Sequence, residues 1–160
     1  MRKYLVVSDN HGRDENFYKV LDIEGKLDGI IHCGDFEGTE GKFALAADCP
    51  VYFVAGNNDF FSDLNREIEF NLCGHKAFLT HGHHYRVSMD VEMLRCEAVS
   101  RGADVVFFGH THKPVAKILG GVYIFNPGSL SYPRQEGRKP SYLVLFVDDK
   151  GEITYEIKYL

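Results

Sequence analysis

The sequence YLVVSDNH at residues 4–11 joins a continuous apolar run to a polar cluster. A short apolar run without alternation predicts a β-strand that is buried on both faces. Such a strand delivers the side chains that follow it to one rim of a sheet. We therefore expect Asp9-Asn10-His11 at the rim of a central sheet.

Four further polar clusters follow in order, and nearly all of them end a short apolar run. They are Gly34-Asp35, Gly56-Asn57-Asn58-Asp59, His81-Gly82-His83 and Gly109-His110-Thr111-His112. Three of the five clusters, those at 9–11, 34–35 and 56–59, are alone typical of an ordinary turn or cap. The cluster at 109–112 is a stronger signal, because two histidines directly after a buried strand can both reach a metal. Together the five clusters place carboxylate, amide and imidazole groups at successive strand ends, which favours a site for borderline divalent metals.

The first third of the chain alternates strands with helices. Strands are predicted over 4–7, 29–33 and 51–54, with a helix over 14–24 and a second helix that includes 43–47. This alternation is typical of parallel βαβ units.

The rest of the chain predicts hairpins, a helix and another buried strand. A helical face formed by Val91, Leu94 and Ala98 ends before Gly102, and a buried strand follows over 105–108. The hairpins are expected at 67–72 with 76–80, at 115–119 with 122–125, and at 142–147 with 153–160; the strand over 153–160 alternates like an edge strand.

These elements number about ten strands and three helices. Ten strands are many for one open sheet, so we expect an α/β (α+β) fold of four αββα layers, in which two packed mixed β-sheets are flanked by helices. The length of 160 residues favours a single domain over 1–160.

Composition restricts the partners. The formal net charge is −5, so no global basic field attracts nucleic acid and no stable nucleic-acid binding is expected. No segment is long and apolar enough to span a bilayer. The four cysteines form no Cys-x-x-Cys pair and lie among apolar neighbours, which favours buried thiols. We expect a soluble protein of the reducing cytoplasm.

The five ordered motifs resemble those of the calcineurin-like metallophosphoesterase superfamily. The small size and the Gly-Asn-Asn-Asp form at 56–59 resemble its YfcE-type phosphodiesterase branch, which is related to the Vps29 scaffold. Asn126-Pro127-Gly128-Ser129 and Pro133-Arg134 also resemble that branch. The likeness runs from about Lys3 to the end of the chain and implies a β-sandwich flanked by helices.

The resemblance implies a role for each cluster. Asp35 would bridge two metals, because a carboxylate has two oxygens to share. Asp59 would orient a ligand through a hydrogen bond. The remaining ligands would be Asp9, His11 and His112 for the first metal, and Asn57, His81 and His110 for the second. The implied catalytic set is Asp35, Asn57, Asn58, Asp59 and His81.

The implied activity is a two-metal phosphodiesterase. Metals about 3.5–4 Å apart would clamp a bridging hydroxide that attacks phosphorus. Manganese is the first expectation because the donors are oxygen and nitrogen only, while iron, nickel and zinc stay open. The substrate would be a small phosphate ester or a nucleotide-like molecule. A phosphomonoesterase and a Vps29-like non-catalytic scaffold stay open as alternatives.

One position departs from the superfamily. Many members carry histidine, a general acid, where this chain has Asn58, and asparagine cannot deliver a proton at neutral pH. Asn58, His83 and Arg134 are candidate substrate contacts, although His83 is equally well explained as a loop histidine. Aromatic residues of the closing hairpin, such as Tyr155, leave self-association into a homo-oligomer open.

Overall fold

The computed structural model describes residues 1–160 and contains two five-stranded sheets. The first sheet has the strand order β10-β9-β1-β2-β3. β1, β2 and β3 are parallel, and β9 and β10 are antiparallel to their neighbours. The bounds are β1 (Arg2–Val7), β2 (Gly29–His32), β3 (Val51–Phe53), β9 (Ser141–Val147) and β10 (Ile153–Tyr159).

The second sheet has the order β4-β5-β6-β8-β7. β5, β6 and β8 are parallel, while β4 and β7 are antiparallel strands at the two edges. The bounds are β4 (Glu67–Leu72), β5 (His75–Thr80), β6 (Val105–Phe107), β7 (Pro114–Leu119) and β8 (Val122–Pro127). The predicted hairpins and βαβ units are confirmed.

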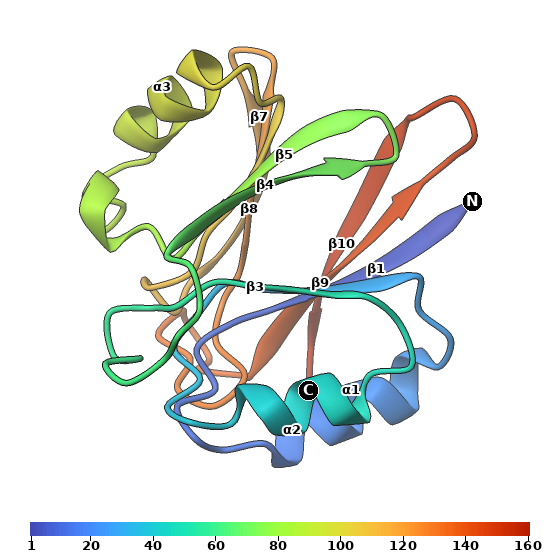
Figure 1. The fold of residues 1–160 in the computed structure, drawn as a ribbon, viewed down its shortest axis with the longest axis vertical. Helices are drawn as coiled ribbons and strands as arrows, with labels where there is room; N and C mark the ends of the chain where they lie inside the picture. The colour runs from blue at the N-terminus through green and yellow to red at the C-terminus, as the bar shows by residue number, and fades with distance from the viewer.

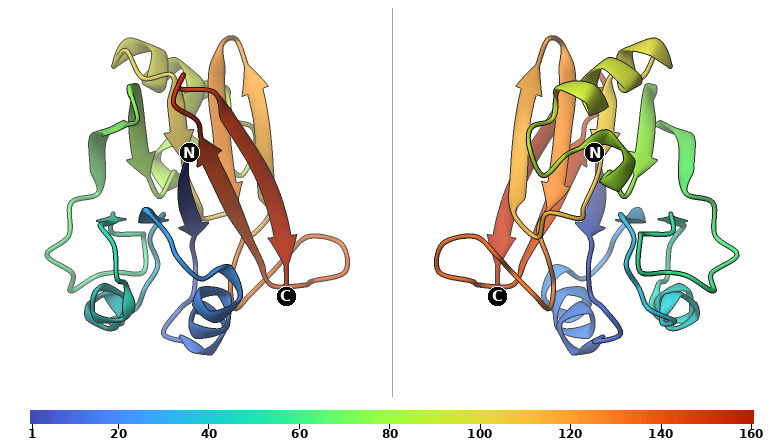
Figure 2. Two further views of the ribbon diagram at one scale, coloured as in Figure 1. Left: turned by 90° about the vertical axis from the view of Figure 1, so that its right-hand side faces the viewer. Right: turned by 90° about the vertical axis from the view of Figure 1, so that its left-hand side faces the viewer.

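Three α-helices cover the outer faces of the two sheets. Helices α1 (Glu15–Glu24) and α2 (Glu40–Ala46) lie together at one end of the molecule, and α3 (Glu92–Ser100) lies at the other (Figure 1; Figure 2). A short 3₁₀ turn, η1 (His83–Tyr85), was not predicted. None of these helices is long and apolar enough to cross a membrane.

Successive side chains of β1 point to opposite faces of the sheet, and both faces are buried, which explains its continuously apolar sequence. Tyr4 and Val6 belong to the core between the sheets, whereas Leu5 and Val7 pack with α1 and α2. A third apolar cluster, which includes Phe78 of β5, joins the second sheet to α3. The predicted four-layer αββα arrangement is therefore confirmed.

Two details differ from expectation. Thiol burial was predicted for all four cysteines, but only Cys33 is buried; Cys49 and Cys73 are half-buried, and Cys96 is exposed on α3. The closing strand β10 is an edge strand as predicted, yet Tyr155 and Tyr159 on its apolar face are 37% and 50% exposed.

Candidate metal centre

The polar clusters meet because parallel strands end at one edge of each sheet. Asp9 follows β1 and Asp35 follows β2, while His81 follows β5. The first sheet therefore contributes the ligand candidates up to residue 57, and the second sheet contributes the histidines from residue 81 onward. The site lies at the seam between the sheets.

The backbone is strained at this seam. Nine residues other than glycine have positive φ, and five of them are predicted ligands: Asp9 (54°), His11 (48°), Asp35 (62°), His110 (69°) and His112 (59°). Residues other than glycine rarely adopt a positive φ, and backbone strain of this kind clusters at functional sites. The backbone of these loops therefore adopts an unfavourable conformation that places the predicted ligands at the site.

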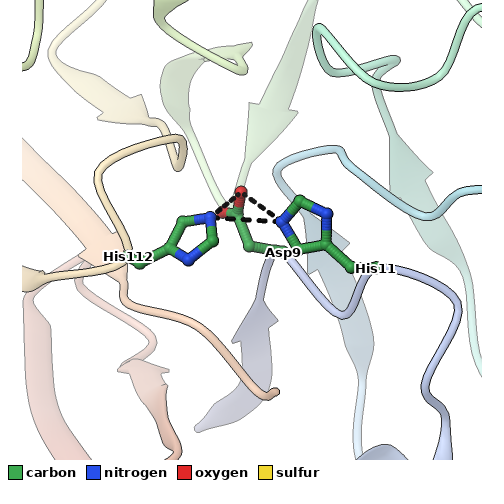
Figure 3. A group of neighbouring side chains, drawn as sticks. All are labelled: Asp9, His11 and His112. Carbon is green, nitrogen blue, oxygen red and sulfur yellow. Dashed lines mark hydrogen bonds and ion pairs between the residues drawn. The ribbon is translucent and has the colours of Figure 1, made fainter. Parts of the chain in front are cut away.

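Asp9, His11 and His112 form a first group (Figure 3). Nε2 of His112 lies 3.2 Å from Oδ1 of Asp9 and 3.2 Å from Nε2 of His11. Nε2 of His11 lies 3.7 Å from the same Asp9 oxygen. Three potential donor atoms thus face one point.

Asp9, Asp35 and His81 form a second group. Nε2 of His81 lies 3.3 Å from Oδ2 of Asp35 and 3.8 Å from Oδ1 of Asp9. Oδ2 of Asp35 also lies 3.7 Å from Nε2 of His11. Asp9 is shared by both groups, and Asp35 faces one histidine of each, so both carboxylates lie between the two positions.

Two further predicted ligands lie beside the second group. Nδ1 of His110 is 3.1 Å from Oδ1 of Asn57, and the rings of His110 and His81 are 5.3 Å apart between centroids. The His110 backbone N–H donates to Oδ2 of Asp9 at 3.1 Å. All seven predicted ligands are therefore brought to one place.

Unpaired atoms test whether these residues fit a metal. Oδ1 of Asp9 and Nε2 of His81 are buried and have no hydrogen-bond partner, which is costly unless a cation or proton occupies the space. Nδ1 of His81 donates to the Cys33 carbonyl and Nδ1 of His112 donates to the Tyr132 carbonyl. These bonds turn both Nε2 atoms toward the centre, as in metal sites. The donor set fits divalent cations.

Electrostatics agree with a site for positive charge. Burial opposes ionisation of Asp9, yet the positive charge of His81 and the nearby imidazoles of His11 and His112 hold its pKa well below the usual range. Burial likewise opposes ionisation of Asp35, whose pKa is lowered by His81. Against burial, Asp9 and Glu37 raise the pKa of His11 to about 9. Asp9 and Asp35 therefore stay ionised at the centre of the site.

Asp59 and Asn58 support Asp35 rather than joining either group. The Asp59 carboxylate accepts the backbone N–H groups of Asp35 (2.8 Å), Gly56 (2.8 Å) and Glu37 (2.7 Å). Asn58 donates its backbone and side-chain N–H groups to the two oxygens of Asp35. A Cβ at Gly56 would lie 2.1 Å from Oδ1 of Asp35, so only glycine allows this approach.

His32 holds two ligand loops together, a role that sequence reasoning missed. Its Nδ1 accepts the Gly34 backbone N–H at 3.0 Å, so its Nε2 carries the proton and donates to Oδ1 of Asn10 at 2.9 Å. Burial lowers the pKa of His32 to about 3 and keeps it neutral. Its polar identity inside an apolar strand was the only signal in the sequence.

The segment 126–129 holds the other loops. Ser129 donates from Oγ to the Asp9 carbonyl at 2.7 Å, and Asn126 donates from Nδ2 to the Gly109 carbonyl at 3.0 Å. The resemblance included this segment, but its residues showed no metal-ligand pattern. Its function here is to position Asp9 and the loop that carries His110.

The candidate substrate contacts lie on different sides of the centre. Arg134 lines a hollow of about 480 Å³ together with His11, His112 and Tyr132. The His83 ring lies 5.6 Å from that of His81 and 6.1 Å from that of His110. Burial and the charge of His81 lower the pKa of His83 to about 4.

Residues 2–150 match the calcineurin-like phosphoesterase superfamily domain, and the chain belongs to this superfamily. It is thus a metal-dependent phosphoesterase. The probable metallophosphoesterase YsnB of Bacillus subtilis is 34% identical over 146 residues, which cover 91% of this chain and 84% of that protein.

A phosphodiesterase and a Vps29 protein are also similar to the chain. The phosphodiesterase YfcE of Escherichia coli is 40% identical over 70 residues, which cover 44% of this chain and 34% of YfcE. The crystal structure of Entamoeba histolytica Vps29 complexed with zinc has a TM-score of 0.78 at 25% identity and covers 98% of both chains. The predicted resemblance is confirmed.

Proposed function

We propose that the chain is a two-metal phosphodiesterase that hydrolyses a small phosphate ester, with residues 1–160 acting as one catalytic domain. The observation that carries this proposal is the pair of overlapping groups that share Asp9, with Oδ1 of Asp9 and Nε2 of His81 left buried and unpaired. Two such positions side by side are typical of binuclear phosphoesterase centres.

The distances support the predicted division of ligands, except that Asp9 faces both positions. Asp9, His11 and His112 would hold one cation, and His81, His110 and Asn57 the other, with Asp35 between them. Asp35 suits the shared position because its Oδ2 faces His11 on one side and His81 on the other. Bound divalent cations supply positive charge for the phosphate and activate a water molecule.

The side chains around the centre position the substrate and the ligands. Asp59 fixes the loops that carry Asp35 and Asn57 through three backbone N–H groups. Arg134 lines the hollow beside His11 and His112, where a cationic side chain can meet a phosphate oxygen. Asn58 can donate a hydrogen bond to a phosphate oxygen but cannot protonate a leaving group.

Manganese is the proposed native metal, because every donor is oxygen or nitrogen. Nitrogen and oxygen donors also accept iron, nickel and zinc, so the affinity order must be measured for each ion. The chain carries a formal charge of −5, which repels an anionic phosphate ester. Attraction of the substrate to the site therefore depends on the bound cations.

The decisive experiment is the hydrolysis of an activated aryl phosphodiester by manganese-loaded protein. Turnover should require the metal and fall to background in Asp35→Asn, which keeps the size of the side chain but loses one anionic oxygen. The matched control is Asp63→Asn, an exposed carboxylate on the loop before β4. An aryl monoester assayed in parallel measures the phosphomonoesterase alternative.

The second candidate is a Vps29-like scaffold, which the structural likeness to Vps29 favours. A scaffold predicts metal binding without turnover. Manganese titration calorimetry and the hydrolysis assay together separate the two: uptake with no hydrolysis of any phosphodiester supports the scaffold, and failure to bind any transition metal contradicts the enzyme.

A further inference from the structure

A second hollow opens beside the metal centre, on the side of Asn58. Its volume is about 410 Å³, within the range of ligand sites. Asn58 forms one wall and contacts both oxygens of Asp35, so the hollow adjoins the predicted bridging ligand. Phe60 and Phe61 line it together with Glu37 and Glu40.

Phe60 and Phe61 are placed differently from every other phenylalanine in the chain. They are 79% and 101% exposed, whereas the other ten are buried or half-buried. Two adjacent rings in water forgo the burial that stabilises the others. A turn in which Ser62 N–H donates to the Asp59 carbonyl holds this segment next to the site. Rings presented in this way offer apolar faces to a ligand.

Charge restricts the occupant. The carboxylates that line this hollow belong to Glu37, Glu40 and Asp59, and no lysine or arginine lines it. A negatively charged group is therefore disfavoured. Oε2 of Glu40 is buried, but its Oε1 is accessible and is engaged by no hydrogen bond or ion pair within the protein, whereas both oxygens of Asp59 accept backbone N–H groups. Glu40 thus leaves one strong acceptor free for an N–H donor.

We propose that this hollow, the base subsite, binds an uncharged nucleobase with an amino group, carried by one alcohol of the phosphate ester. The base stacks on Phe60 or Phe61, and its N–H donates to Glu40. The assignment rests on the proposed function only for the position of the phosphate. It narrows the substrate class to nucleotide esters of adenine, cytosine or guanine.

The test compares two ligands that differ only in the base. Adenosine 5′-monophosphate and ribose 5-phosphate are titrated into manganese-loaded protein by calorimetry. Stacking on an aromatic side chain contributes about 1–3 kcal/mol per base, so the nucleotide should bind about 5- to 150-fold more tightly. The double variant Phe60→Ala/Phe61→Ala should abolish this preference, and Phe61→Tyr should keep it.

Two further variants separate stacking from surface hydrophobicity. Glu40→Gln replaces an acceptor oxygen with an amide and should weaken nucleotide binding without changing ribose 5-phosphate binding. Met89→Ala, at a position 81% exposed and outside the hollow, should change neither. Equal binding of the two ligands by the native protein overturns the proposal, as does an undiminished preference in the double variant or binding of neither ligand.

The outcomes also distinguish failure of the base subsite from failure of the proposed phosphodiesterase activity. Nucleotide preference without diester hydrolysis contradicts the enzyme and leaves the base subsite standing. Hydrolysis without nucleotide preference contradicts the base subsite alone. Sedimentation velocity gives a last check: if the native protein is a dimer and the double variant a monomer, the two rings form an interface between copies and the proposal is wrong.

Discussion

Asn58 donates to both carboxylate oxygens of Asp35, from its backbone N–H to Oδ1 and from its side chain to Oδ2, each at 2.9 Å. Oδ2 also lies 3.3 Å from Nε2 of His81. The side chain at position 58 therefore reaches the centre of the site. Its chemical identity should decide which leaving groups the site can expel.

The variant Asn58→His should favour substrates with poor leaving groups. An imidazole at this position can deliver a proton, and general acid catalysis contributes about 10²–10⁴-fold where a proton is needed. The ratio of kcat/KM for an alkyl ester to that for an activated aryl diester should rise at least tenfold. Equal changes for both esters would contradict a proton-donor role for position 58.

Loss of His112 should remove one metal position. His112 belongs only to the group of Asp9 and His11, so His112→Ala should lower manganese stoichiometry from two to one by elemental analysis. The affinity loss should exceed the roughly 10–100-fold that is typical of outer-sphere partners. The matched control is His84→Ala, an exposed neighbour of the site. Unchanged stoichiometry in His112→Ala would contradict its role as a ligand.

Asp59 should matter for stability as well as activity. Asp59→Asn leaves one oxygen to satisfy three backbone N–H groups, and an unsatisfied buried donor costs about 1–3 kcal/mol. Urea unfolding should show a loss of that size, and metal affinity should fall. The exposed control Asp63→Asn should change neither quantity. Full stability in Asp59→Asn would show that the loops are held by other contacts.

Glu24 should make stability depend on acid pH. Its carboxylate bonds Lys3 at 2.9 Å, Lys158 at 3.0 Å and Tyr142 at 2.8 Å. Burial raises its pKa, but these partners outweigh burial and lower the pKa below its ordinary value. The ion pairs therefore stabilise the fold above the unfolded pKa of about 4.3, and the contribution is lost as pH falls through the folded pKa.

The variant Glu24→Gln tests this dependence. At pH 7 it should be less stable than the native protein by roughly 1–3 kcal/mol, because it leaves the half-buried ammonium groups of Lys3 and Lys158 without their anionic partner. The difference should shrink as the pH falls below about 4. The exposed control Glu15→Gln should show no such trend. A difference that stays constant with pH would contradict an ionic role for Glu24.

The fold could be predicted because strand and turn signals are contained in short stretches of sequence. The run Tyr4–Val7 identified a strand covered on both faces, and the Gly120-Gly121 turn identified a hairpin, with both glycines at positive φ. Ligand candidates were found because Asp9 and His81 follow strand ends directly. The chain order alone placed them at one rim.

Long-range hydrogen bonds could not be predicted in the same way. The role of His32 was missed, since its bond to Asn10 exists only when two loops meet. The Tyr132 carbonyl that orients His112 is a backbone group and carries no sequence signature. The exposure of Phe61 depends on a turn that leaves its ring uncovered. Each of these depends on tertiary placement rather than on local composition.

The seam position of the ligands has a mechanical consequence. Asp9 and Asp35 extend from one sheet and His81 and His112 from the other, so cations held between them would fasten the two halves of the sandwich together. Stripping the ions would then ease the parting of the sheets and expose the chain to proteases. Ion supply would set how long the molecule survives as well as how fast it works.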